Sequence, residues 1–331
     1  MPKITTPKTQ KKENLAKSAK PKAQEAPQAL QKKSGFISIV GKPNVGKSSI
    51  MNALVGEKVS IVTPKSQTTR DKIIGILTEN NYQMIFVDTP GMHEDKTELS
   101  RHMNKQVQQA ARDSDVVMVV LDATKPVSDT MYSSIERFLG RNYPVYVVIN
   151  KIDLAGFEKT YPMLQRLAEL TVPTQGRKAI KEIIPVSAKT KENLDKLKQF
   201  LIDELQPGEF FYPEDDITDR PIRFMIEELI REKALLFLQD EIPHGIGVSI
   251  ETMTDEIGLA SIEADIICEK DTHKLIVIGK GGQMLKEIGT SARLAAEKLL
   301  EKKVYLKLFV KVRDNWRNRT NIMDDLGYGK N

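Results

Sequence analysis

The sequence predicts an α/β domain with a mixed, mostly parallel and doubly wound sheet, followed by a smaller α+β domain. Short apolar runs alternate with helical patterns over residues 35–205, which is the order of a doubly wound sheet. A stretch rich in Pro, Gly and acidic residues at 206–221 is typical of a linker. Residues 222–331 follow a different order of elements, so we expect a second domain there, as a length of 331 residues allows.

Six apolar runs are the expected strands of the first domain, because near-continuous apolar segments are typical of buried parallel strands. They are Phe36–Val40, Ile73–Leu77, Met84–Val87, Val116–Leu121, Val145–Ile149 and Ile183–Val186. A helix is expected from about Thr97, because Leu99, Met103 and Val107 recur at the spacing of one helix face.

The second domain is expected to contain a helix over 222–238, strands over 246–253 and 260–268, a helix-turn-helix around Gly279–Gly282, and a last strand over 304–313. The helix after the turn would carry Met284, Leu285, Ile288, Leu294 and Leu299 on its apolar face. In the last strand, Val304, Leu306, Leu308, Val310 and Val312 would face the core, and Tyr305, Lys307, Phe309, Lys311 and Arg313 the other side. Whether helices cover that other side stays open. Asp314–Arg317 is expected to start a helix, with Trp316 as a packing anchor and Cys268 as a small core residue.

Residues 1–34 are expected to be a disordered tail. They are rich in Lys, Gln, Pro and Ala and bury too little apolar surface to offset the entropy of ordering. Nine lysines and two acidic residues give this tail a charge of +7. A single cysteine excludes an internal disulfide framework, and no apolar stretch approaches the length of a membrane span.

Charge is segregated along the rest of the chain. Residues 222–270 carry 4 basic and 11 acidic residues, whereas residues 271–331 carry 13 basic and 7 acidic residues. Basic segments at both ends of the chain favour a polyanionic partner, either nucleic acid or an anionic membrane surface.

A phosphate-binding loop is predicted at Gly41-Lys42-Pro43-Asn44-Val45-Gly46-Lys47-Ser48, which matches GxxxxGK[ST] between a strand and a helix. Glycines let backbone N–H groups turn toward phosphate oxygens, and the helix N-terminus favours negative charge. Lys47 would contact the terminal phosphates, and the Ser48 hydroxyl would bind Mg²⁺.

The base is predicted to be guanine. Asn150-Lys151-Ile152-Asp153 follows an expected strand, and a carboxylate there accepts from both the ring N–H and the exocyclic amine of guanine. Adenine lacks both donors, so Asp153 would be left unpaired. Asn150 would bridge to the other base edge, the Lys151 stem would cover the ring, and the Ser187-Ala188 backbone would donate to the guanine carbonyl.

Two further segments would approach the γ-phosphate and Mg²⁺. In Asp88-Thr89-Pro90-Gly91, Asp88 would hold Mg²⁺ through water, and the Gly91 N–H would contact the γ-phosphate. Within Ser66–Asp71, a threonine would bind both, and we favour Thr69 over Thr68. Lys47, Thr69 and Gly91 are therefore the predicted catalytic set, and Ser48, Thr69 and Asp88 the predicted metal ligands.

These motifs together resemble the Era branch of translation-factor-type GTPases. The resemblance rests on GKPNVGKS, QTTRD, DTPG, NKID and SAK over residues 35–190. The position after DTPG is Met92, which cannot orient the attacking water as the glutamine of Ras-like enzymes does. In some relatives the phosphate-loop Asn helps bind K⁺. Asn44 stands at that position, and a loop-stabilising hydrogen bond is the alternative.

Gly279-Lys280-Gly281-Gly282 matches GxxG between two expected helices, where a KH domain binds the backbone of about four nucleotides. This placement and the phrases Glu241–Pro243, Ile278–Gly282 and Val310–Trp316 resemble the type II KH domain of the Era family. The tail is a departure from that family.

The resemblance implies a GTP-hydrolysing switch that binds small-subunit ribosomal RNA near its 3′ end and acts in maturation of the 30S subunit. It also implies a cytoplasmic monomer with peripheral association at the inner membrane. Two alternatives stay open: an RNA-binding assembly factor whose GTP or GDP is only a conformational ligand, and a membrane-surface GTPase recruited by the Lys-rich tail.

Overall fold

The computed structural model describes residues 31–65, 68–92, 97–141, 143–175, 178–239 and 242–328. Residues 1–30, most of the predicted tail, lie outside this description, as do Ser66, Gln67 and Glu241. The predicted end of the tail at residue 34 is wrong, because the first strand, β1 (Lys33–Gly41), already begins at Lys33. Residues 32–331 form one compact unit.

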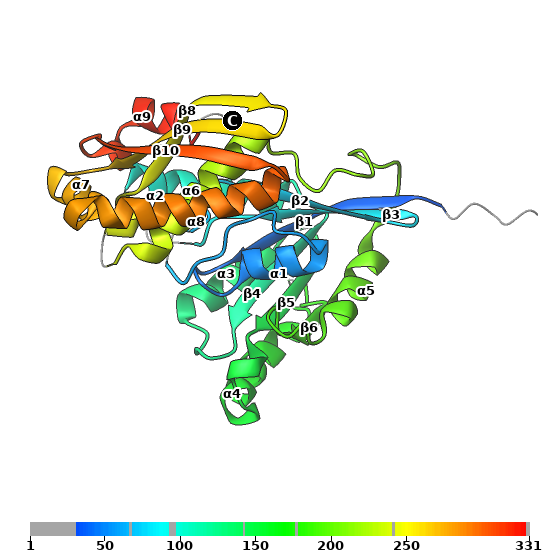
Figure 1. Cartoon of the computed structure of the whole chain (residues 1–331). Helices are drawn as coiled ribbons and strands as arrows, with labels where there is room; N and C mark the ends of the chain where they lie inside the picture. Colours follow the sequence, from blue (N-terminus) through cyan, green and yellow to red (C-terminus); the bar gives the residue numbers. More distant parts are fainter. Residues whose placement is uncertain are drawn as a thin grey trace, which may run out of the picture. The chain divides into compact units, whose positions relative to one another are not determined.

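The first sheet has the predicted mixed and mostly parallel topology (Figure 1). Six of its strands lie in the order β2-β3-β1-β4-β5-β6, and among these six only β2 runs antiparallel to its neighbour. After β1 they are β2 (Ile73–Glu79), β3 (Tyr82–Asp88), β4 (Val116–Asp122), β5 (Val145–Asn150) and β6 (Glu182–Pro185). All six predicted strands are confirmed, because each apolar run is long enough to cross a sheet covered on both faces.

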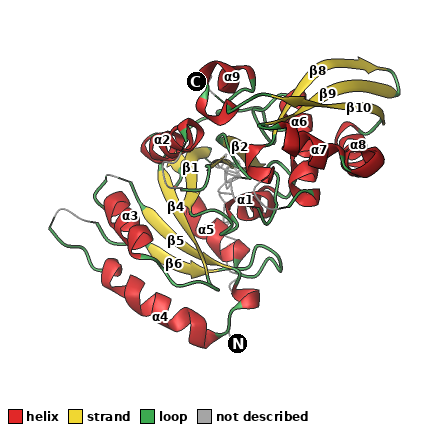
Figure 2. Ribbon diagram, turned by 90° about the vertical axis from the view of Figure 1, so that its left-hand side faces the viewer, coloured by secondary structure: helices red, strands yellow, loops and turns green. Residues whose placement is uncertain are grey.

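Helices cover both faces of this sheet (Figure 2). The helices α1 (Lys47–Val55) and α5 (Leu194–Glu204) pack on one face; α2 (Glu98–Arg112), α3 (Asp129–Leu139) and α4 (Phe157–Ala168) pack on the other. The 3-10 turns η1 (Ile152–Leu154) and η2 (Glu169–Thr171) flank α4. Thr97 caps α2 by accepting from the Ser100 N–H, and the predicted Leu99, Met103 and Val107 are buried. Because β1, β3, β4 and β5 are parallel, the loops that follow them meet at one edge of the sheet.

The second domain has the predicted α+β fold. Its elements are α6 (Ile222–Phe237), η3 (Ile242–Gly245), β8 (Gly247–Glu256), β9 (Leu259–Cys268), α7 (Asp271–Ile278), η4 (Lys280–Gly282), α8 (Gln283–Leu300) and β10 (Lys303–Val312). The sheet order is β10-β9-β8, with β9 parallel to β10 and antiparallel to β8. Cys268 is fully buried in the core, as predicted. Figure 1 shows α8, in orange, beside β10.

Two details of this domain differ from prediction. The helix expected at Asp314–Arg317 is only a 3-10 turn, η5 (Trp316–Asn318), and the next helix is α9 (Thr320–Asp325). Leu294 is 55% exposed, because it lies on the outer side of α8. Trp316 is the predicted packing anchor: it is fully buried, and its Nε1 donates to the Gly245 carbonyl at 2.9 Å.

The predicted linker is bonded to the first sheet. Its first residues form β7 (Gln206–Pro207), antiparallel to the start of β1. The buried Gln83 side chain accepts from the Phe211 and Tyr212 N–H groups. The Ile76 N–H donates to Ile217 O at 2.9 Å, so the linker runs beside the β2 edge. None of the described helices is long and apolar enough to cross a membrane.

Candidate functional sites

The predicted phosphate loop connects β1 to α1, and its geometry requires glycine. Gly46 precedes α1 with φ +98°, a left-handed conformation that favours glycine. A Cβ at Gly46 would lie 2.1 Å from Asn150 Nδ2, and one at Gly41 would lie 2.5 Å from Val120 O. The loop is therefore held against the ends of β4 and β5.

Lys47 is buried within this loop, 6% exposed. Its ammonium donates to the carbonyls of Gly41 at 3.3 Å and Lys42 at 3.2 Å. Burial lowers the pKa of Lys47 to about 8, and the nearby Asp88 carboxylate opposes that shift. Anionic phosphate oxygens at this position would restore a high pKa.

Three oxygen-bearing side chains meet in front of α1, as predicted for metal ligands. The Ser48 hydroxyl donates to Asp88 Oδ2 at 2.5 Å and lies 3.1 Å from Thr69 Oγ1. Asp88 is fully buried, and desolvation raises its pKa although Lys47 opposes the shift. We call Ser48, Thr69 and Asp88 the oxygen cluster.

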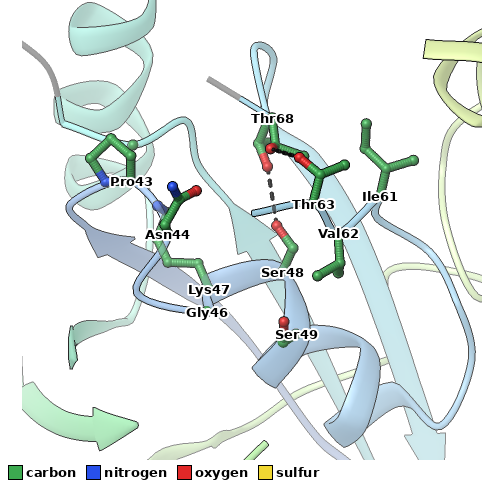
Figure 3. A pocket seen from close by; sticks show the side chains of 12 residues that line it. Pro43, Asn44, Gly46, Lys47, Ser48, Ser49, Ile61, Val62, Thr63 and Thr68 are labelled. Atoms are coloured by element: carbon green, nitrogen blue, oxygen red, sulfur yellow. Dashed lines mark hydrogen bonds between the residues drawn. The ribbon is translucent and has the colours of Figure 1, made fainter. Parts of the chain in front are cut away.

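The structure places Thr69 rather than Thr68 at this cluster. The Thr68 hydroxyl bonds instead to Thr63 Oγ1 and Lys65 O, each at 2.7 Å. Figure 3 shows the pocket in front of α1, with Asn44 and Lys47 on one side and Thr63 on the other. The preference for Thr69 therefore agrees with the geometry.

Two residues at this end of the site were missed by the sequence analysis. Ser60 donates to Asp88 Oδ2 at 3.0 Å, so it helps to orient the carboxylate. Asn52 fixes Ser60, because its side chain accepts from the Ser60 N–H and donates to the Ser60 carbonyl. Neither residue stands in a recognisable motif, and only the fold brings them to Asp88.

The segment after β3 lies against the phosphate loop. A Cβ at Gly91 would lie 2.7 Å from Pro43 Cγ, so the Gly91 backbone is in close contact with the loop. The Thr89 hydroxyl donates to Ile39 O at 2.7 Å, which gives Thr89 an anchoring role. The Met92 N–H donates to Gly41 O at 3.1 Å, and its side chain packs against the core. Pro90, predicted with them, is buried in the same segment.

The Asn150 amide connects two loops of the site. Its Nδ2 donates to Val45 O at 2.9 Å, and its Oδ1 accepts from the Ala188 N–H at 3.0 Å. One backbone N–H of the segment predicted to contact the guanine carbonyl, that of Ala188, is thus used by Asn150. An amide has two hydrogens and two lone pairs, so Asn150 retains capacity for one further bond of each kind.

Asp153 lies at the same edge of the sheet, in η1 after Ile152. Its Oδ1 accepts from the Ser187 hydroxyl at 2.8 Å, and that hydroxyl accepts from the Thr190 N–H at 3.1 Å. The Asp153 side chain is exposed. The carboxylate is therefore oriented from one side and open to a ligand from the other.

Lys151 joins the two halves of the site through a residue that the sequence analysis missed. Its ammonium donates to Asn44 O at 2.5 Å and to Asp122 Oδ2 at 2.7 Å. Asp122 ends β4 and is 5% exposed. Asp122 could have been noticed in the sequence, because it is an acidic residue at the end of a buried parallel strand. The Asn44 amide donates to Pro64 O at 2.8 Å, which is the loop-stabilising bond that was the alternative to K⁺ binding.

The GxxG turn joins α7 to α8 in strongly non-helical conformations. Gly279, Gly281 and Gly282 have φ of +74°, +60° and +79°. Lys280 is exposed, and a Cβ at Gly281 or Gly282 would meet no atom within 4 Å. The tip of the turn is thus open to a ligand, and at Gly279 the nearest Cβ contact would be Met284 at 2.6 Å.

The surface beside this turn contains aromatic, apolar and cationic groups. Leu275 and Ile276 of α7 are 71% and 48% exposed. The five residues expected opposite the core, four on β10 and one directly after it, are all exposed, so no helix of the described chain covers them; they are Tyr305, Lys307, Phe309, Lys311 and Arg313.

Acidic side chains of residues 222–270 lie on this same surface. Lys307 pairs with Glu263 at 3.2 Å, and Lys311 pairs with Asp265. Both acids come from β9, the strand parallel to β10, and equal register places their side chains on the same face. The basic surface near the turn is therefore partly neutralised.

Comparison with known proteins matches both domains. Residues 36–151 match the family model described as 50S ribosome-binding GTPase, and residues 241–317 match the KH domain model. The chain is similar to GTPase Era of Clostridium acetobutylicum, with 45% identity over 296 residues, 89% of this chain and 98% of that protein. GTPase Era of Clostridium botulinum strain Alaska E43 is 44% identical over 90% of this chain and 99% of its own length.

Two solved structures share the whole arrangement at 38% identity. One is Era in complex with MgGDPNP and nucleotides 1506–1542 of 16S ribosomal RNA, with a TM-score of 0.84 over 90% of this chain and all of that chain. The other is Aquifex aeolicus Era bound to GDP and aluminium fluoride, with a TM-score of 0.83 and the same coverage.

Proposed function

Since this chain belongs to the Era family of GTPases, we propose that it binds small-subunit ribosomal RNA near its 3′ end and acts in maturation of the 30S subunit. GTP hydrolysis would switch the protein between two states of that interaction. The main support for this proposal is that one compact unit contains both an open GxxG turn and an assembled phosphate loop with its oxygen cluster.

The phosphates would bind along residues 41–48. Gly46 allows backbone N–H groups to point at them, and Lys47 would exchange its carbonyl partners for β- and γ-phosphate oxygens. Guanine would lie beside Asp153, with the Lys151 stem over the ring and Asn150 holding the two loops around the base.

The oxygen cluster fits Mg²⁺. Hydroxyl and carboxylate oxygens are the ligands this hard cation prefers, and Asp88 Oδ1 is buried without a partner among the described residues. Ser48 and Thr69 would hold the ion directly, and Asp88 through water. The bound ion would neutralise charge on the β- and γ-phosphates.

Hydrolysis would proceed by in-line attack of water on the γ-phosphate. The Lys47 ammonium and the Gly91 N–H would stabilise charge on the γ-phosphate oxygens. Met92 has no polar group to orient water, so we expect slow intrinsic turnover and water positioned by backbone groups, a second water or a partner. If K⁺ contributes through Asn44, replacing K⁺ with Na⁺ should lower the rate, and equal rates would exclude that role.

RNA would bind at the GxxG turn, where Gly281 permits close approach of the backbone and Lys280 adds charge. The related Era structure was solved with a 16S ribosomal RNA fragment, which supports this partner. The Tyr305 and Phe309 rings would be available for stacking with bases.

A double variant, Lys280→Asp with Gly281→Asp, tests the RNA site. A Cβ at Gly281 meets no atom within 4 Å, and aspartate is one of the residues that tolerate the left-handed φ of +60° there, so the fold should persist at a small cost. Two carboxylates would then occupy the position of phosphates. RNA affinity should fall at least about tenfold, with a flatter salt dependence. GTP binding is the folding control. Full RNA affinity in this variant would move the RNA site elsewhere, first to the Lys-rich tail.

The domain organisation and location are also part of the proposal. We assign residues 33–205 to the GTPase domain, 206–221 to a linker and 222–331 to the KH domain, in a cytoplasmic monomer. Peripheral membrane association through the tail would require binding to anionic vesicles that deletion of residues 1–30 abolishes.

A further inference from the structure

Four consecutive residues, 68–71, connect the oxygen cluster to the C-terminal domain. We call them the switch segment. Thr69 Oγ1 lies 3.1 Å from Ser48 Oγ, whereas the Thr68 carbonyl and the Arg70 side chain contact the C-terminal domain. Arg231 of α6 donates to the Thr68 carbonyl, and Arg70 reaches the segment between α6 and β8. The first domain therefore holds the hydroxyls of Thr68 and Thr69, and the C-terminal domain holds the Thr68 carbonyl and the Arg70 side chain.

Arg70 is fully enclosed by the C-terminal domain. It is 1% exposed, and its guanidinium donates to the carbonyl oxygens of Ile246 and, at 2.9 Å, of His244. The guanidinium carbon also lies 5.4 Å from the centre of the Trp316 ring and 5.8 Å from that of Tyr328. A planar group with five donors suits several carbonyls and flat rings at once, which an ammonium does not.

Contacts on both sides restrict the backbone at Thr69. Arg231 is 1% exposed and is itself fixed by a bidentate pair with Glu228. Next along the chain, Asp71 Oδ2 accepts from Arg220 at 2.7 Å. Adjacent Cα atoms are held about 3.8 Å apart, so fixing residues 68, 70 and 71 limits the positions that Thr69 can take.

We propose that Arg70 is a positioning residue for GTP hydrolysis: seated in the C-terminal domain, it holds Thr69 at the position from which its hydroxyl meets Ser48 and Asp88. The proposal rests on the proposed role of Thr69 as a metal ligand. It makes hydrolysis depend on the contact between the two domains, although no residue of the C-terminal domain lies in the oxygen cluster.

The test compares full-length variants in single-turnover hydrolysis and in separate titrations with GTP and GDP. Arg70→Ala should lower the hydrolysis rate at least about tenfold while GDP affinity stays within about threefold, because Thr69 serves only the triphosphate state. Arg231→Met keeps the side-chain volume and removes the bond to Thr68, so it should act in the same direction. Arg293→Ala is the matched control: it removes an arginine paired with Glu297 on α8 of the same domain, away from the residues that contact Arg70, and should leave the rate within about twofold.

A double variant separates positioning from stability. In a Thr69→Ala protein, adding Arg70→Ala should cause no further loss of rate, because the residue being positioned is already gone. A further tenfold loss, or parallel losses of GDP affinity and rate in Arg70→Ala, would overturn the positioning role. An unchanged rate in Arg70→Ala beside an impaired Thr69→Ala would overturn it too. An unchanged rate in Thr69→Ala would refute the proposed metal role of Thr69 itself.

Discussion

Replacing Asp153 with asparagine changes a double acceptor into one acceptor and one donor at the guanine end of the site. In the structure, Asp153 Oδ1 accepts from the Ser187 hydroxyl, and the exposed carboxylate has lone pairs left for two donors of the base. In Asp153→Asn, the new NH₂ group would face the exocyclic amine of guanine. One charge-assisted hydrogen bond is lost, and two donors are left opposed.

These two effects set the expected loss of GTP binding free energy. A hydrogen bond to a charged group contributes about 1.5–3 kcal/mol, and an unsatisfied donor costs about 1–3 kcal/mol. GTP binding should therefore weaken by about 3–5 kcal/mol, or about two to four orders of magnitude in Kd. Xanthine carries a carbonyl in place of the amine, so XTP should bind the variant better than GTP does.

Calorimetric titration of GTP and XTP into both proteins measures this exchange of preference. Ser187→Ala is the matched control, because it removes only the orienting hydroxyl and should weaken GTP binding by about threefold to tenfold. An Asp153→Asn protein that binds GTP as tightly as the original, or that gains nothing for XTP, would refute the assignment of Asp153 to the base.

Three other predictions concern the phosphate end. Gly46→Ala should abolish nucleotide binding, because the new Cβ would overlap Asn150 Nδ2, 2.1 Å away. Since the φ of residue 46 is +98°, the same change should lower the free energy of unfolding by at least about 1–2 kcal/mol, which denaturant titration measures. The pKa of Lys47, about 8 in the free protein, should rise when phosphate binds, so the bound state holds more protons. GTP affinity should then be flat below pH 8 and fall by up to about tenfold per pH unit above it, and a rising affinity would contradict this. Met92→Ala should keep hydrolysis within about tenfold, since only its backbone N–H contacts the phosphate loop, and a thousandfold loss would show that its side chain has a catalytic role.

Much of the candidate site could be predicted because its parts are contiguous in sequence. The phosphate loop is one strand–loop–helix unit, and its glycines are required by local backbone geometry at Gly46. Asp88 and Asn150 each end a buried parallel strand, and parallel strands bring their carboxyl ends to one edge. The choice of Thr69 over Thr68 also agrees with the geometry.

The misses share one cause, which is distance along the chain. Asp122 was overlooked because its partner, Lys151, is 29 residues away, and Ser60 because Asp88 is 28 residues away. The charge counts showed only that acidic residues gather in 222–270 and basic residues in 271–331 of the chain. The register of β9 with β10 places Glu263 beside Lys307.

The sequence by itself determined the succession of strands and helices along the chain, the phosphate loop and the residues expected to contact guanine. Periodicity and short motifs depend only on neighbours within a few residues. Only the tertiary structure decided what each polar group contacts. Arg70 belongs to a short polar segment that predicted nothing beyond a loop near the γ-phosphate. Folding brings Arg70 into contact with the carbonyl of Ile246, which is 176 residues away in the sequence. The burial of Arg70 among carbonyls and aromatic rings depends on tertiary packing, which no local sequence pattern encodes.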